Sequence, residues 1–144
     1  MNDAAGEPRG GSEAGNVALR VVAPTSEIRN LADEVTTAGG VVVDIGLFVP
    51  APKEQDDYLQ SAFEPLSVLA CVIAVTWAAE RIIRMLRLAR HSGLIVEKTD
   101  TGFEVREHPA LAPGSVLSLG PGGARYIEGS AQLDVAEVSK LLGR

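Results

Sequence analysis

The chain has 144 residues, of which 46% are hydrophobic and 4% aromatic, and its formal net charge is −6. This length fits one domain with a core of ordinary size, and the composition is that of a folded globular protein. Proteins that bind duplex nucleic acid usually carry a basic surface, so the acidic balance disfavours that class. The single Cys71 excludes an internal disulfide and zinc sites of the common spacings, and its apolar neighbours predict a core role.

Residues 1–15 are rich in Gly, Ala, Glu and Ser and show no periodicity. We expect a disordered leader there, followed by a single domain over residues 16–144. The leader has no apolar segment of the kind that signal peptides contain. We therefore expect a cytoplasmic protein in a reducing compartment.

The first part of the domain predicts a βαβ unit. Apolar residues alternate in "NVALRVVA", as in a strand, and recur at helical spacing in "SEIRNLADEV", which Gly39 and Gly40 end. The nearly all-apolar run "VVVDIGLF" that follows is typical of a buried strand. We expect the two strands to be parallel, joined by a right-handed crossover.

Residues 65–91 read "PLSVLACVIAVTWAAERIIRMLRLARH" and carry no charge before Glu80. We expect one long helix that begins at Pro65 and stops at Gly93. Its first half is apolar on all sides and should be enclosed, whereas its second half is amphipathic. A bilayer span needs about 20 predominantly apolar residues, so a core helix is favoured over membrane insertion.

The last third predicts two hairpins and a short helix. "GLIVEKTDTGFEVREH" turns at "TDTG", where Gly102 is expected to supply a positive φ. "SVLSLGPGGARYIEG" turns at residues 121–123, and Asp134 and Glu137 have the spacing of a capping box before "VAEVSKLLGR". The whole order is strand, helix, strand, long helix, two hairpins and short helix, which predicts an α+β fold.

Few residues suggest chemistry. His91 and His108 have no nucleophile at a known motif spacing, and "LGPGGAR" lacks the Lys-Ser/Thr end of a phosphate-binding loop. Asp44 is the most interesting carboxylate, because a charge inside a buried strand needs a partner, although an exposed position on a one-sided strand is favoured. We expect no enzyme activity, no cofactor, no metal and no small-molecule substrate.

The expected partner surface lies on the predicted long helix, and the partner is expected to be a protein or a second copy of the chain. The arginines also leave open attraction to an acidic membrane surface. The surface combines the arginines of the second half of the helix with apolar residues of the first: Arg81, Arg84, Arg87, Arg90, Leu69, Ile73 and Trp77.

Two resemblances bear on function. "RMLRLARHSGLIVEKTDTGFEVRE" is similar to the last helix and wing of a winged-helix domain, in which Arg84, Arg87 and Arg90 would contact nucleic acid. That fold requires a helix-turn-helix upstream, whereas this sequence predicts a continuous apolar helix, and the net charge also disfavours it.

The second resemblance covers most of residues 17–142. The order of "VALRVV", "SEIRNLADEV", the apolar helix ending in arginines, "LIVEK", "FEVRE" and "LDVAEVSKLL" resembles the effector-associated constant component proteins of actinobacterial conflict systems. Members of that family are thought to be non-enzymatic and are encoded beside peptidase, caspase-like or other effectors. The resemblance therefore implies an accessory protein that binds a partner.

Overall fold

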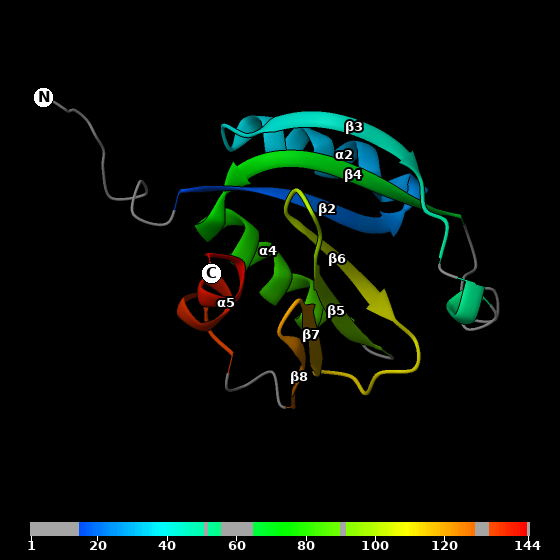
Figure 1. Cartoon of the computed structure of the whole chain (residues 1–144). Coiled ribbons are helices and arrows are strands. Elements are labelled where there is room, and N and C mark those ends of the chain that lie inside the picture. Colours follow the sequence, from blue (N-terminus) through cyan, green and yellow to red (C-terminus); the bar gives the residue numbers. More distant parts are fainter. Residues whose placement is uncertain (1–14, 51, 56–64, 90–91, 129–132, 144) are drawn as a thin grey trace, which may run out of the picture.

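The computed structural model describes residues 15–50, 52–55, 65–89, 92–128 and 133–143. The predicted α+β fold class is confirmed (Figure 1). The elements in chain order are β2 (Asn16–Pro24), α2 (Thr25–Thr37), β3 (Val41–Leu47), the 3-10 helix η1 (Pro52–Glu54), β4 (Leu66–Ala74), α4 (Val75–Leu88), β5 (Gly93–Lys98), β6 (Phe103–His108), β7 (Val116–Gly120), β8 (Gly123–Ile127) and α5 (Val135–Gly143).

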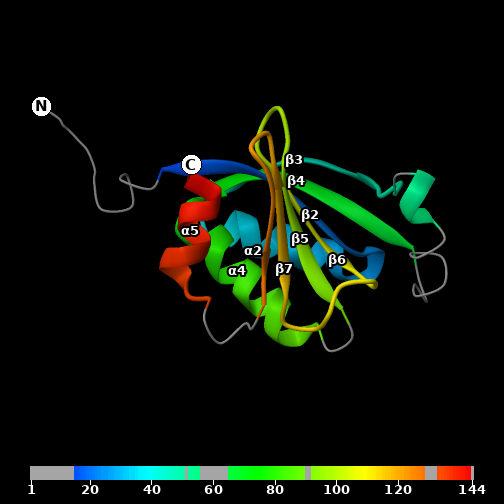
Figure 2. The same ribbon diagram turned by 60° about the horizontal axis from the view of Figure 1, so that its bottom comes forward.

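The described strands form one mixed sheet in the order β3-β4-β2-β6-β5-β7-β8. Neighbouring strands are antiparallel except for two parallel pairs, β2 with β6 and β5 with β7. Helix α2 packs on β4, β3 and β2, α4 packs on β2, β4 and β5, and α5 packs on α4. Figures 1 and 2 show these helices together on one side of the sheet, and β3 and β8 are its two edge strands.

A strand that passes directly into a helix occurs twice. Pro24 ends β2 with φ −53° and ψ 139°, and Ala74 ends β4 with φ −58° and ψ 138°. The first helical residue of each unit then donates its N–H to the residue before the other strand: Thr25 to Pro65 O and Val75 to Gly15 O, both at 3.0 Å. The two units are fifty residues apart in sequence. Gly15, Pro24 and Thr25 of the first correspond to Pro65, Ala74 and Val75 of the second. The chain therefore contains a β-α-β-β-α-β arrangement with local two-fold symmetry.

The strands of each βαβ unit are not neighbours in the sheet. Strand β4 lies between β2 and β3, and both β2 and β6 lie between β4 and β5. Strands β2 and β3 are each antiparallel to β4, so they run parallel to one another as predicted, but they do not pair directly. The inner position of β4 makes it the strand on which the first half of the sheet is built.

The core fills the space between the sheet and the helices. Alternate residues of β2 and β4 point into it, where they meet the apolar sides of α2 and α4. The largest fully buried side chains include Leu19, Leu31, Leu69, Ile73, Ile82 and Leu94.

Two predicted helix ends are confirmed. Gly39 adopts φ 89° after α2, and the Gly40 N–H donates to Val35 O at 2.9 Å, which is the hydrogen-bond pattern of a Schellman motif. At the start of α5, Asp134 Oδ1 accepts the Glu137 N–H at 2.9 Å. These ends fix the length of each helix locally, independent of the packing around it.

The predicted long helix is wrong in its first half. Residues Leu66–Ala74 form β4, and the helix spans only Val75–Leu88. Pro65 precedes the strand and does not begin a helix. A continuous apolar run has neither strand nor helix period, and no turn residue marks the junction at Ala74, so the two elements read as one. The segment "DDYLQSAFE", residues 56–64, whose sequence predicts a short helical turn, lies outside the described residues.

The shortened helix also bears on membrane insertion. Among the described residues, no helix combines the length and the apolar content that crossing a bilayer requires. The apolar half of the predicted helix is largely buried, but as strand β4, whose alternate side chains pack in the core against α2 and α4, while Val72 is 36% exposed.

Gly102 is needed for a reason other than the predicted one. Its φ is not in the positive region, and a Cβ built there would overlap the carbonyl oxygen of Ala18 on β2. The turn is closed instead by Thr99, whose N–H donates to Gly102 O at 2.8 Å. Glycine is required because β2 and the β5–β6 turn approach more closely than any side chain permits.

We expect Gly102→Ala to lower the free energy of unfolding by at least about 3 kcal/mol, because the overlap is with backbone that cannot move aside. Gly122→Ala is the matched control, since no atom lies within 4 Å of a Cβ at that position. Urea denaturation followed by circular dichroism measures both variants. Equal midpoints for the two variants would contradict the proposed close approach.

Candidate functional site

The edge strand β3 exposes its apolar side chains. The exposed fractions are 62% for Val41, 64% for Val43, 49% for Ile45, 75% for Leu47 and 76% for Val49. We call these five residues the edge strip. The prediction of a buried strand is wrong here, because among the described strands only β4 flanks β3. A nearly continuous apolar strand is normally covered on both faces, so the exposed strip is the least expected feature of the surface.

The backbone of β3 also has an open side. The Phe48 N–H donates to Leu66 O at 3.0 Å, so the backbone groups of Phe48 and Gly46 point toward β4. The groups of Ile45 and Leu47 point the opposite way, because directions alternate along a strand. In the described part of the chain no strand pairs with that side. The edge therefore offers hydrogen-bonding groups to an added strand.

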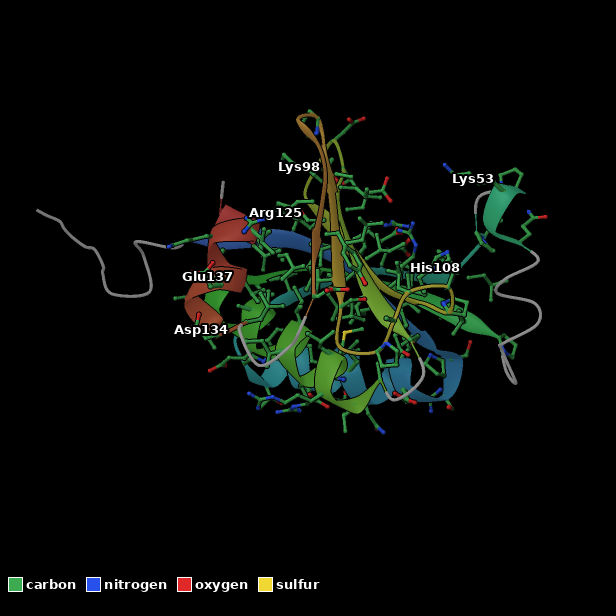
Figure 3. All side chains as sticks on the ribbon, turned by 90° about the horizontal axis from the view of Figure 1, so that it is seen from below. Lys53, Lys98, His108, Arg125, Asp134 and Glu137 are labelled. Atoms are coloured by element: carbon green, nitrogen blue, oxygen red, sulfur yellow. The ribbon has the colours of Figure 1, made fainter. Side chains whose placement is uncertain are left out.

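The segment that contains the edge strip is almost free of charged residues. Asp44 is the only charged residue between Gly39 and Pro52. It pairs with Ala70 in register and is exposed, as the sequence favoured. Lys53 on η1 is the next charged residue, and Figure 3 shows it at the end of the molecule away from α5.

A pocket of about 300 Å³ adjoins the edge strip and has a charged lining. Arg106 Nη1 lies 2.8 Å from Glu104 Oε2 and 3.0 Å from Glu97 Oε1, and Arg20 Nε lies 3.2 Å from Glu104 Oε1. Two arginines and two glutamates thus balance one another. The apolar part of the lining is formed by Leu47, Phe48, Val49 and Val68.

This ion-pair network is structural in character. The Arg106 side chain is only 7% exposed and that of Glu104 only 15%, so the two charges depend on each other. Arg20 contributes less, because its side chain is 47% exposed and water screens the contact. Sequence reasoning missed the network, although Glu104 and Arg106 are spaced two residues apart as on one face of a strand.

We expect Arg106→Met to lower the free energy of unfolding by about 3 kcal/mol, because it leaves the Glu104 carboxylate largely buried without its main partner. Arg20→Met removes a similar charge at the exposed end of the network and should cost less than about 1 kcal/mol. Urea titrations of both variants give the comparison. An equal loss in the two would show that burial does not set the strength of the network.

The apolar residues predicted for partner binding are covered within the chain. Leu69 is 0% exposed and Ile73 is 2% exposed, because both point from β4 into the core. Trp77 is partly buried against the same core. These three residues therefore do not form an exposed apolar patch.

The predicted arginine surface is partly used to join the helices. Arg81 Nη1 lies 2.9 Å from Glu34 Oε1 on α2, and Arg84 Nη1 lies 3.8 Å from the same oxygen. Arg87 is exposed, and Arg90 lies outside the described residues. Arg81 and Arg84 thus serve the α2–α4 contact.

The hairpin after α4 is not a free wing. Strand β6 pairs with β2, and β5 pairs with β7, so the β5–β6 hairpin lies inside the sheet. The element directly before α4 is β4, which differs from the helix-turn-helix that a winged-helix domain requires.

The remaining candidates have local roles. His108 is buried, and its Nδ1 accepts the Ala110 N–H at 3.1 Å in the turn after β6, while His91 lies outside the described residues. Among the described residues, no group of His, Cys, Asp and Glu side chains could hold a metal ion. Cys71 lies in the core at 2% exposure, as predicted, and burial raises the pKa of its thiol from 9.0 to about 11.

We expect the Cys71 thiol to resist iodoacetamide at pH 8 in the folded protein and to react fully in urea, because it is both enclosed and protonated. Since its pKa is higher in the folded state than in the unfolded state, stability should also fall as the pH rises from 9.0 toward 11. Mass spectrometry of the alkylated protein measures the first effect and urea titration at several pH values the second. Rapid alkylation without urea would contradict this.

No known protein family, no curated protein and no solved structure matches the chain.

Proposed function

We propose that this chain is a non-enzymatic protein-interaction module that binds its partner through the edge strip. The observation that carries the proposal is the apolar edge of β3 and of the residues just after it, where Leu47 and Val49 are 75% and 76% exposed beside a backbone edge that no described strand pairs with. Natural proteins usually protect such edges with charges or with a covering segment, because an open apolar edge pairs with other strands. A partner strand that pairs with β3 covers this edge.

The chemistry of the site favours recognition. The outward N–H and C=O groups of Ile45 and Leu47 can give affinity through a backbone ladder. The exposed side chains add apolar contact, which is the dominant favourable contribution in most protein association. The neighbouring network of two arginines and two glutamates, Arg20, Arg106, Glu97 and Glu104, is balanced internally, so it adds no net charge that would select an ionic ligand.

We further propose an accessory role in the cytoplasm, beside an effector protein. The support is the resemblance of residues 17–142 to effector-associated constant component proteins, which implies a non-enzymatic partner-binding role. An accessory protein of this kind needs a surface for its partner, and the edge strip provides one. The arginine face of α4 is less suited, since Arg81 and Arg84 contact Glu34 of the same chain.

The test compares Leu47→Lys with Leu88→Lys. Leu88 is 70% exposed at the end of α4, so both variants place a lysine at a similarly exposed leucine, one on the edge strip and one away from it. Tagged protein is used to isolate the partner from cells that make the chain naturally, and the purified partner is then titrated by calorimetry. We expect Leu47→Lys to weaken binding at least tenfold and Leu88→Lys to bind as the unmodified chain does.

Circular dichroism spectra of the two variants control for folding, because lysine on an exposed edge is tolerated by a sheet. Equal binding by both variants would place the interface elsewhere and refute the proposed role of the edge strip. Loss of binding in Leu88→Lys alone would move the interface to the exposed end of α4.

A further inference from the structure

We infer that the strand covering the edge strip is β3 of a second copy of this chain, added antiparallel about a two-fold axis at Leu47. The inference rests on the proposed function, because it names the partner of the same edge. Two-fold pairing of identical surfaces is the commonest way in which soluble proteins form dimers.

The segment that surrounds Leu47 meets the requirements of both the accepting strand and the added strand. It reads "IGLFVP" over residues 45–50, without a charged side chain; Ile45–Leu47 belong to β3, and the Phe48 N–H continues the pairing with β4 by donating to Leu66 O. The chain as a whole has a net charge of −6, so two copies repel one another over most of their surfaces. A neutral apolar edge is the surface at which that repulsion is smallest.

The position of Asp44 selects the register. With the axis at Leu47, Ile45 lies opposite Val49 of the second copy and Asp44 opposite its Pro50. The two Asp44 residues are then six positions apart along the strand, or about 20 Å. An axis at Ile45 would instead bring the two carboxylates into diagonal positions about 7–8 Å apart, where like charges repel.

The β-bulge supports the same register. The regular pairing of β3 with β4 is interrupted between Val42 and Asp44, so the backbone around Val43 does not present an even row of hydrogen-bonding groups. An axis at Leu47 uses the regular backbone after the bulge. An axis at Ile45 would have to use the bulge itself.

The register places the two Leu47 residues directly opposite one another. Since the backbone groups of Leu47 point outward, the two form a hydrogen-bonded pair, in which Cα atoms lie about 5.5 Å apart. This separation is within the range that a disulfide bridges. The two copies of Val41, by contrast, do not lie opposite one another in this arrangement, because they are about 40 Å apart.

The first experiment measures mass in solution. Sedimentation equilibrium over a wide range of concentrations should show the 15.1 kDa chain passing to twice that mass. Leu47→Lys should remain a monomer throughout, whereas Leu88→Lys should dimerise as the unmodified chain does. If the unmodified chain stays a monomer at the highest concentration, the inference is overturned.

The second experiment tests the register. Under mild oxidation Leu47→Cys should form a covalent dimer, and Val41→Cys, at a comparably exposed position of the same strand, should not. The buried Cys71 does not compete for the cross-link. A covalent dimer of Val41→Cys, or none of Leu47→Cys in a chain that dimerises, would overturn the axis at Leu47.

The outcomes separate this inference from the proposed function. If the chain stays a monomer but Leu47→Lys loses a different protein partner, the edge strip binds that partner and the second copy is refuted. If the chain neither dimerises nor loses a partner in Leu47→Lys, the inference and the proposed function both fail.

Discussion

The antiparallel pairing of β2 with β4 is the constraint on which the rest of the structure depends. It extends over the full length of both strands, from Asn16 opposite Ala74 to Pro24 opposite Leu66. At each end it is extended by one hydrogen bond from the first turn of a helix, so the pairing also sets where α2 and α4 begin. Both helices consequently leave toward the same face of the sheet, and the core forms between them and the strands.

This arrangement leaves β3 with an edge that no strand in the described part of the chain covers. The central pair places β4 inside the sheet and β3 outside it, with one neighbour only. The buried ion pair of Arg106 and Glu104 lies on β6, which pairs with β2 on the side away from β4. There the sheet itself supplies the oppositely charged partners. Strand β3 has a single charged residue, Asp44, and among the described residues it takes part in no comparable ion-pair network. The surface thus changes from charged side chains that pair with one another to exposed apolar side chains within a few strands.

The sequence predicted the α+β class, both hairpins, the end of α2 and the start of α5, because these depend on local signals such as Gly39 or Asp134. The sequence-based predictions were wrong in two segments that contain almost no polar residues. "VVVDIGLF" and "LSVLACVIAV" are both continuous apolar runs, and such runs reveal neither helix nor strand, nor whether a neighbour covers them. The network of Arg20 with Glu104, and the clash that forbids a side chain at Gly102, arise from strands more than eighty residues apart in sequence, so local patterns cannot show them.

The two βαβ units explain why β3 in particular lacks a cover. Strand β5 ends the second unit as β3 ends the first, and it has β6 on one side and β7 on the other. Ile95 in β5 is accordingly only 3% exposed, whereas Ile45 in β3 is 49% exposed. The chain continues beyond β5 into strands that cover it, but the segment after β3 returns to form β4 on the inner side. An apolar strand of the same kind is therefore covered by the chain itself in one unit, whereas in the other no described strand covers its outer edge.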